Sequence, residues 1–486
     1  MRAKLIRTFI LTGLVALPFA SLNAQTQQVK PWEKIPIPAL HSFKPEQPKR
    51  IVLKNGIVVF LEEDHELPFV QGSITLRGGS REEPAAKVGL VELYGETWRT
   101  SGTATLSGDA MDDQLEAMAA KIETGGELES TSLSWDCLKG DFDKVFALSV
   151  DLLLHPKFDG EKLQLAQQQI ATDIVRRNDD AGGIAAREAA KLVYGAESPY
   201  AREPEIATIS AVTLADLDAW HRQTVQPANM LISVSGDFDS ASVEAKLRAA
   251  FESLPAGKAF PAARVEFPAP KPGLYFVNKD DVNQSNIRIV GLGTDRRNPD
   301  LYALAVMNEV FGGGFGSRLF QKIRTKMGLA YSVGGSYGAG WDHPGTFRVS
   351  AGTKSESTVD ALTAMKAEIE ALRTEPVTAE EVARAKDQLL NGWIFEYDTK
   401  DKVLSAQVRL AFFGYPSNYL EKYREGLEKV TPADVERVAR KYVDPAKLAI
   451  LVVGNQKQIQ PPLAKLGDVT TLDITIPMPA GMGAQQ

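Results

Sequence analysis

Two side chains that could act on one ligand lie seven residues apart in the second half of the chain. Arg324 carries a permanent positive charge, and Tyr331 carries a phenol that can donate a hydrogen bond. The segment between them predicts a short amphipathic turn that ends at Gly328, followed by a strand over residues 329–333. Such a reversal brings Arg324 and Tyr331 toward the same place. The alternative is that Arg324 is a solvated surface residue and that Tyr331 belongs to the core.

Three consecutive glycines, Gly312, Gly313 and Gly314, precede this segment. A helical pattern of apolar residues over 301–310 leads into them, so we expect the glycines to end a helix. Because glycine has no side chain, the backbone can also come close to a ligand here. The three glycines are therefore candidate substrate-binding residues.

The composition is that of an ordinary globular protein with two or more domains. The chain has 486 residues, of which 44% are hydrophobic and 24% are charged. A net charge of −7 argues against nucleic acid as the main partner. The single cysteine, Cys137, cannot form an internal disulfide, and its place in an alternating apolar run predicts a buried thiol.

The first residues predict export. A basic start is followed by an apolar run over residues 8–20 and by small residues suited to cleavage after Ala24. The run is too short to anchor the chain in a membrane, and we expect no later stretch to span one. Residues 1–24 are thus predicted to be a signal peptide, and in a bacterium the product would be periplasmic. Residues 25–48 are rich in proline and predict an extended lead.

Strand and helix patterns interleave after residue 48. Asn55-Gly56 between two apolar runs predicts a hairpin, and alternation over residues 69–77 predicts a further strand. Helices are predicted over 88–99, 109–124, 142–154, 161–179 and 214–225, and strands over 127–138 and 229–236. Hairpins within this alternation indicate an α+β fold.

An internal repeat divides the chain. Residues 213–236 align without a gap on residues 431–454, with ten identities in twenty-four positions. A proline-rich stretch lies between the copies. We therefore predict two homologous domains, at residues 49–255 and 273–459, joined by a linker at 256–272 and followed by a tail at 460–486.

The chain resembles the pitrilysin/insulinase family of zinc metallopeptidases, in the two-domain form related to mitochondrial processing peptidase. The resemblance rests on residues 53–56, 77–83, 102–103, 316–320 and 324–331. It implies two homologous α/β-sandwich halves that face each other as a clamshell, each with a mixed, mainly antiparallel sheet covered by helices. It also implies that substrate peptide binds as an added strand at a sheet edge.

The resemblance breaks at the metal site. Active members carry His-x-x-Glu-His on the helix after the Gly-Ser-Arg turn, where the histidines bind zinc and the glutamate activates water. Here Glu92 and Glu96 occupy the histidine positions, Gly95 occupies the position of the general base, and Asp173 lies near that of the third ligand. None of the five histidines forms a pair at ligand spacing. We therefore expect no metal site and no cofactor in this chain.

The Arg/Tyr pair of the family is present. Arg324 and Tyr331 match, in type and spacing, the pair that in this family holds substrate and helps to stabilise the oxyanion. In the two-domain branch this pair commonly sits on a chain without the zinc motif. The resemblance thus implies a non-catalytic subunit, exported if the predicted signal peptide is correct, that supplies the pair in trans to a homologous, zinc-bearing partner with His-x-x-Glu-His. Two alternatives stay open: a clamshell that binds peptides or proteins without proteolysis, and an independent metallopeptidase with a carboxylate metal site.

Overall fold

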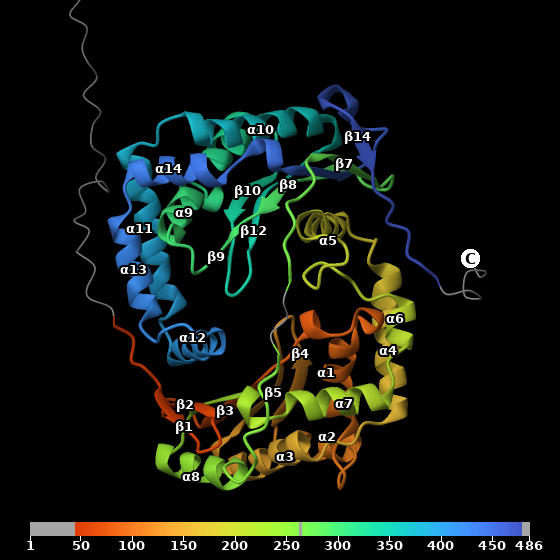
Figure 1. Cartoon of the computed structure of the whole chain (residues 1–486), viewed down its shortest axis with the longest axis vertical. Coiled ribbons are helices and arrows are strands. Elements are labelled where there is room, and N and C mark those ends of the chain that lie inside the picture. The colour runs from red at the N-terminus through yellow and green to blue at the C-terminus, as the bar shows by residue number, and fades with distance from the viewer. Residues whose placement is uncertain (1–43, 262–264, 479–486) are drawn as a thin grey trace, which may run out of the picture. The chain divides into compact units, whose positions relative to one another are not determined.

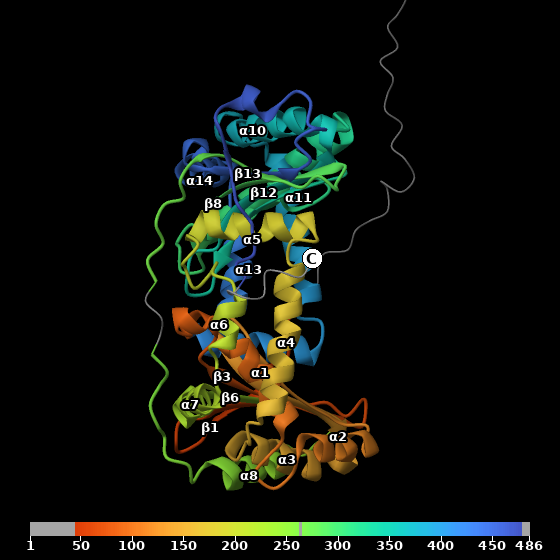
Figure 2. The same ribbon diagram turned by 90° about the vertical axis from the view of Figure 1, so that its right-hand side faces the viewer.

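The computed structural model describes residues 44–261 and 265–478. The predicted signal peptide lies outside the described residues. Residues from Pro45 onward form one unit, which contains both copies of the repeat. Figures 1 and 2 show its helices and two sheets from two directions.

The first half of the chain builds a six-stranded sheet in the order β1-β2-β6-β3-β5-β4. All neighbouring strands are antiparallel except the parallel pair β2 and β6. The predicted hairpin at Asn55-Gly56 joins the first two strands, with Val52 opposite Val58. The strands are β1 (Lys49–Val52), β2 (Val58–Glu63), β3 (Phe69–Arg77), β4 (Lys121–Gly126), β5 (Ser130–Leu138) and β6 (Met230–Gly236).

The second half builds a sheet in the order β10-β12-β8-β13-β7-β14, so five strands follow the same path as β4-β5-β3-β6-β2. The sixth strand, β14, comes from the stretch predicted as a tail and pairs parallel to β7. These strands are β7 (Gly273–Asn278), β8 (Gln284–Leu292), β10 (Ser332–Tyr337), β12 (Thr346–Lys354), β13 (Ala449–Gly454) and β14 (Val469–Thr471), beside a small parallel pair, β9 (Thr294–Asp295) and β11 (Ala339–Gly340). Two homologous, mainly antiparallel sheets covered by helices confirm the predicted fold class.

The helices of the first half are α1 (Leu90–Ser101), α2 (Gly108–Ala117), α3 (Phe142–Leu154), α4 (Gly160–Arg176), α5 (Ala181–Tyr194), α6 (Ile206–Ser210), α7 (Leu214–Thr224) and α8 (Ser240–Phe251). Those of the second half are α9 (Leu301–Asn308), α10 (Thr358–Thr374), α11 (Ala379–Glu396), α12 (Lys400–Phe413), α13 (Tyr419–Lys429) and α14 (Pro432–Tyr442). The repeat is visible in their caps. Thr213 and Asp216 cap α7 reciprocally, and Thr431 and Asp434 cap α14 in the same way.

One helix of each half covers the sheet of the other half. Helix α5 packs its apolar face on β7, β8 and β13, with Ile184 and Ala185 against Val290 and Leu451. In return, α12 lies on β2 and β6 through the apolar cluster Phe60, Leu231, Leu404 and Phe412. Figure 1 shows α5 beside the second sheet and α12 on the side of the first sheet where β2 lies. The two halves are therefore joined by two apolar clusters that are separate from the main core of each half.

The predicted helix over residues 109–124 is wrong in its second part. Helix α2 ends at Ala117, Ala119 adopts a left-handed conformation, and β4 begins at Lys121. Ile122 is buried, as the helical pattern required, but it is buried as a strand residue opposite Trp135. Pairing with β5 thus overrode the local helical periodicity.

Candidate functional site

The degenerate metal-site helix, α1, lies against a cavity of about 500 Å³ in the first half. The buried carboxylate of Glu83 accepts hydrogen bonds from the backbone N–H groups of Gly89 and Val91, each at 3.0 Å, and so caps the start of the helix. The helix turns its apolar side to the core and leaves two glutamates exposed. The cavity is lined by Glu83, Glu92, Gly95, Glu96, Glu127 and Arg202, among others.

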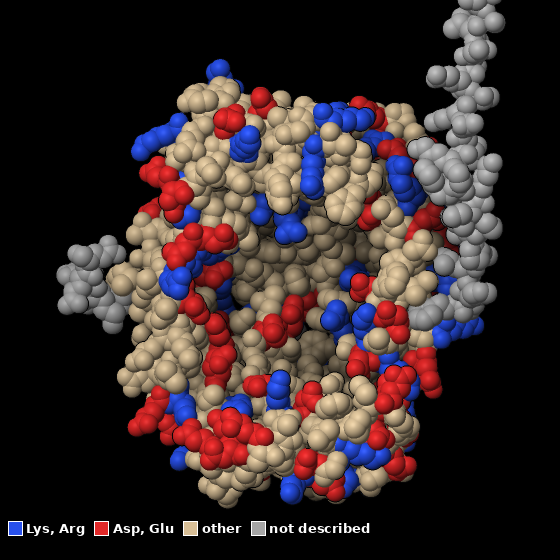
Figure 3. Space-filling model, turned by 180° about the vertical axis from the view of Figure 1, so that it is seen from behind, with Lys and Arg blue, Asp and Glu red and all other residues tan. Residues whose placement is uncertain are grey.

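Several carboxylates gather around this helix. The pKa of Glu92 is raised, first by loss of solvent and then by the charges of Glu96, Asp173 and Glu203. Within the described ranges, no basic side chain forms an ion pair with Glu92, Glu96 or Asp173. Figure 3 shows a hollow on one face of the molecule, with acidic and basic side chains around it.

The predicted degenerate positions do not fit zinc. Glu92, Glu96 and Asp173 offer only carboxylate oxygens, whereas zinc sites use histidine or cysteine for most ligands. Among the described residues, these three carboxylates do not come close enough together to share one ion. Gly95 has no side chain that could take a proton from water. The arrangement supports no hydrolytic step at this site.

Gly95 is also packed too tightly to regain a side chain. A Cβ atom at this position would lie 2.7 Å from the backbone nitrogen of Gly126 and 2.9 Å from the carbonyl carbon of Gly125, both in the edge strand β4. The second half repeats this contact: a Cβ atom on Gly312 would lie 2.6 Å from the Cα atom of Gly335 in β10. In both halves, therefore, a helical glycine rests directly on the backbone of an edge strand.

The predicted glycine turn of the second half differs slightly from expectation. Helix α9 continues as a π-helical turn over Glu309–Gly313 and ends at Gly314, so the first two glycines lie inside it. Gly312 is buried against β10, whereas Gly313 is exposed and Gly314 is half-buried beside the Glu309 carboxylate. Of the three candidate substrate-binding glycines, the structure thus leaves Gly313 and Gly314 within reach of a ligand.

The structure brings Arg324 and Tyr331 together. A π-helical turn over Phe320–Lys326 carries Arg324, and it ends where Gly328 takes a left-handed conformation with φ of 64°. The chain then reverses, so that the Arg324 guanidinium lies 5.7 Å from the centre of the Tyr331 ring. Tyr331 is 80% exposed and stands just before β10, which begins at Ser332 rather than at the predicted residue 329. It is therefore a surface residue, not part of the core.

Two aromatic residues beside this pair were missed by the sequence reasoning. Phe315 and Phe320 pack edge to face, with ring centres 4.9 Å apart, and Arg324 also lies 4.9 Å from the Phe320 ring centre. Phe315 is 75% exposed between Gly314 and Gly316. The sequence did carry a signal for Phe315, because a large apolar residue flanked by glycines in a turn is a candidate for an exposed contact residue.

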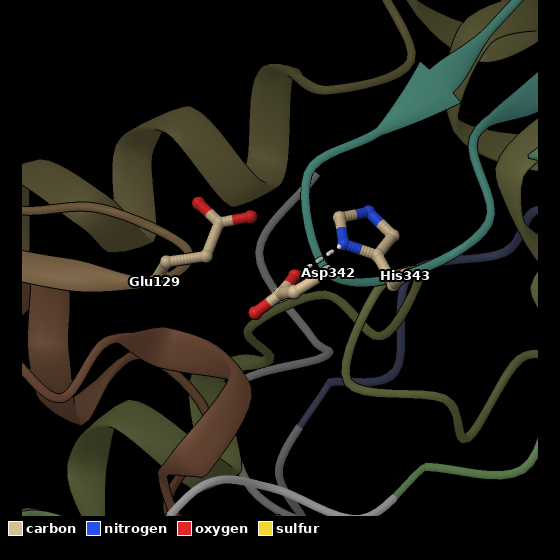
Figure 4. Close-up of side chains that lie close together, drawn as sticks. All are labelled: Glu129, Asp342 and His343. Atoms are coloured by element: carbon tan, nitrogen blue, oxygen red, sulfur yellow. Dashed lines mark hydrogen bonds and ion pairs between the residues drawn. The ribbon is translucent and has the colours of Figure 1, made fainter. Parts of the chain in front are cut away.

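A second group of polar residues lies between the two halves. Glu129 faces Asp342 and His343 across a gap (Figure 4), and each offers a ligand atom within 4.8 Å of the others, the one such group among the residues described. However, Arg81 Nη1 donates to Asp342 Oδ2 at 2.8 Å, and the His343 ring packs 4.2 Å from that of Tyr200. The Arg81 guanidinium already supplies the positive charge here. We therefore interpret the group as an ionic contact between the halves.

The pKa values in this contact agree with that interpretation. Burial acts to raise the pKa of Asp342, but hydrogen bonds from His343 and Arg81 outweigh it and lower the pKa. Burial raises the pKa of Glu129, against the opposing charges of Arg81 and His343. The sequence carried no pattern for this contact, because its residues come from distant segments.

Comparison with known proteins identifies the family. Residues 58–182 match the insulinase (peptidase family M16) domain, and residues 211–389 match the peptidase M16 inactive domain. The chain belongs to the insulinase family. Its sequence lacks the His-x-x-Glu-His motif of the active members.

Relatives match over most of their length. An uncharacterized zinc protease of Streptomyces coelicolor is 26% identical over 405 residues, covering 81% of this chain and 86% of the relative. A protein of Helicobacter pylori described as a non-peptidase homolog is 24% identical over 422 residues, and the match covers 83% of this chain and 93% of the Helicobacter protein.

Solved structures of the family share the fold. The peptidase M16 inactive domain of Pseudomonas fluorescens has a TM-score of 0.74 at 24% identity, and the match covers 84% of this chain and 98% of the Pseudomonas chain. A protease from Helicobacter pylori has a TM-score of 0.71 at 20% identity, and the match covers 84% of this chain and 100% of the Helicobacter chain. These likenesses establish the fold alone.

Proposed function

We propose that this insulinase-family protein is an exported, non-catalytic subunit of a heterodimeric zinc metallopeptidase. It binds peptide substrate and supplies Arg324 and Tyr331 to the zinc site of a homologous partner subunit that carries His-x-x-Glu-His. The observation that carries the proposal is a contrast between the halves. The first half lacks the two histidines and the glutamate base of the family's zinc motif, whereas the second half has an accessible arginine and tyrosine at one place.

The chemistry of the Arg/Tyr pair supports a role at a reacting carbonyl. A guanidinium and a phenol both donate hydrogen bonds, and donors aimed at a developing oxyanion stabilise an acyl-transfer transition state. This chain has no general base of its own at Gly95, so the pair needs a catalytic centre on another chain. Location in the periplasm follows from the predicted signal peptide and is part of the proposal. Among the described residues, none of the helices has the length and apolar composition needed to cross a bilayer.

The sheet edges support peptide binding as an added strand. Strand β4 ends the first sheet and β10 ends the second, directly after Tyr331. Part of each edge is already capped: Arg99 Nε donates to the Ile122 carbonyl in β4, and the Asn308 side chain accepts from the Tyr337 N–H in β10. The rest of each edge offers backbone groups to a peptide.

The proposal is tested by reconstitution. Tagged protein should co-purify an untagged homologue with His-x-x-Glu-His, and the pair should cleave peptides. Tyr331→Phe removes only the hydroxyl, so turnover should fall on the order of 10²–10³-fold while the Michaelis constant changes little. Gel filtration checks that the complex still assembles.

Two results count against this function. If the Tyr331→Phe complex assembles and keeps full turnover, the hydroxyl has no part in the chemistry. If no zinc-bearing homologue associates, the remaining candidate is the binding module without proteolysis. The exposed aromatic residues beside Arg324 favour that second candidate over an independent metallopeptidase, whose carboxylates do not come together.

A further inference from the structure

Four side chains form a continuous column on the surface of the second half. Phe315 contacts Phe320 edge to face with ring centres 4.9 Å apart, and Arg324 lies over both the Phe320 ring, at 4.9 Å, and the Tyr331 ring, at 5.7 Å. These distances are within the range of favourable ring–ring and cation–π contacts. We call Phe315, Phe320, Arg324 and Tyr331 the aromatic column. Its members hold one another in place before any ligand arrives.

The two ends of the column are open to solvent. Phe315 is 75% exposed and Tyr331 is 80% exposed, although both are large aromatic residues. The contacts within the column order these side chains, so a partner would lose little conformational freedom in covering them. Exposed aromatic residues held in this way are typical of binding surfaces.

Arg324 differs from the basic residues beside it in having no acidic partner in the described part of the chain. Arg318 makes two hydrogen bonds to the Glu381 carboxylate, at 2.7 and 2.8 Å, and Lys322 is paired with Glu368. Among the described residues, the Arg324 guanidinium lies over two aromatic rings and forms no hydrogen bond or ion pair. Its N–H edge is therefore free to bind a carboxylate, the group whose planar geometry it matches.

We propose that the aromatic column binds a peptide that carries an aromatic side chain next to a carboxylate. The peptide's ring packs on Phe315 at one end of the column, and its carboxylate accepts hydrogen bonds from Arg324. This inference rests on the proposed function for the peptide nature of the ligand, and it adds the class of peptide. It assigns that recognition to this chain alone, before any partner subunit takes part.

Binding of three labelled, unstructured peptides to the purified chain tests the proposal. The peptides are identical except at two central positions, which read Phe-Asp, Ala-Asp or Phe-Asn, and affinity is measured by fluorescence anisotropy. The Phe-Asp peptide should bind about tenfold more tightly than either of the others. Phe315→Ala should abolish the preference for Phe over Ala and keep that for Asp over Asn. Arg324→Gln should abolish the preference for Asp over Asn and keep that for Phe over Ala.

The matched control is Phe395→Ala. Phe395 lies on α11, is 68% exposed, and has no ring contact with the column. This variant should bind all three peptides as the unchanged chain does. Circular dichroism checks that each variant is folded. Arg324→Lys keeps the positive charge but loses the planar guanidinium, so it should weaken the preference for Asp over Asn.

Equal binding of the three peptides by the unchanged chain overturns the proposal. So does an equal loss of affinity in Phe315→Ala and Phe395→Ala. If Phe315→Ala weakens association with a partner subunit and leaves peptide binding unchanged, the column is a subunit contact and the proposal is wrong. The assay needs no partner, so a chain that selects Phe-Asp but never assembles with a zinc-bearing homologue overturns only the proposed heterodimer.

Discussion

His221 is a buried histidine of the first half, with 7% of its surface exposed. Its Nε2 lies 3.0 Å from the carbonyl oxygen of Leu153, which can only accept, so Nε2 carries the proton. Nδ1 then accepts a hydrogen bond from the Tyr94 hydroxyl at 2.9 Å. The folded protein thus holds a neutral imidazole, and burial lowers the pKa of His221 from 6.5 to about 4.

This histidine should make the stability of the first half depend on pH. The unfolded chain takes up a proton near pH 6.5 and the folded chain only near pH 4, so the contribution is complete above pH 6.5 and is lost as the pH falls toward 4. At about 1.4 kcal/mol per pKa unit, the free energy of unfolding should drop by about 2 kcal/mol between pH 7 and pH 5. Urea unfolding at both pH values measures this. His221→Gln should remove most of the difference, and an unchanged pH dependence in that variant would show that other groups cause it.

At the scale of elements, the contact between α1 and β4 decides what the lost metal site could become. Alanine normally favours a helix over glycine by about 1 kcal/mol, so a glycine-to-alanine change within a helix should stabilise the protein. At Gly95 the new Cβ atom would meet the backbone of Gly126 at 2.7 Å, and overpacking of this kind costs about 1–3 kcal/mol. We predict that Gly95→Ala lowers the melting temperature. Glutamate, the general base of active relatives, should lower it further.

The matched control for Gly95 is Gly392. It lies within α11, and a Cβ atom there would meet nothing within 4 Å. Gly392→Ala should therefore raise the melting temperature slightly. If Gly95→Ala stabilised the protein as much as Gly392→Ala, α1 would be free to move, and the base position would be open to repair.

These elements also show what the sequence could predict. Periodicity alone placed α3 and β3 at their observed bounds, and the seven-residue spacing placed Arg324 near Tyr331, because both depend on local geometry. The contact of Gly95 with Gly126 could not be foreseen, since it depends on how closely a helix approaches a distant strand. The same holds for α5 and α12: an apolar face predicts burial, but not which sheet the helix covers.

For the whole molecule, the exchange of α5 and α12 joins the two halves through shared apolar clusters. The contact of Arg81 with Asp342 adds an ionic link from the first half to the second. In both halves a helical glycine packs on the backbone of an edge strand. What differs is the surface: carboxylates line the cavity beside α1, whereas Arg324, which has no acidic partner among the described residues, lies against the Phe320 and Tyr331 rings. The proposed peptide-binding surface and the degenerate metal site thus lie on different halves of the chain.

Metal content provides the test at this scale. Because Glu92, Glu96 and Asp173 do not come together and Gly95 supplies no base, we predict that the isolated chain holds no stoichiometric zinc and does not cleave unstructured peptides. The complex with a homologue that carries His-x-x-Glu-His should contain one zinc per pair of chains, and chelation should abolish its activity. Elemental analysis and a peptide hydrolysis assay on both samples measure this. Two zinc ions per pair, or one per isolated chain together with chelator-sensitive hydrolysis, would mean that this chain has a metal site of its own and catalyses without help.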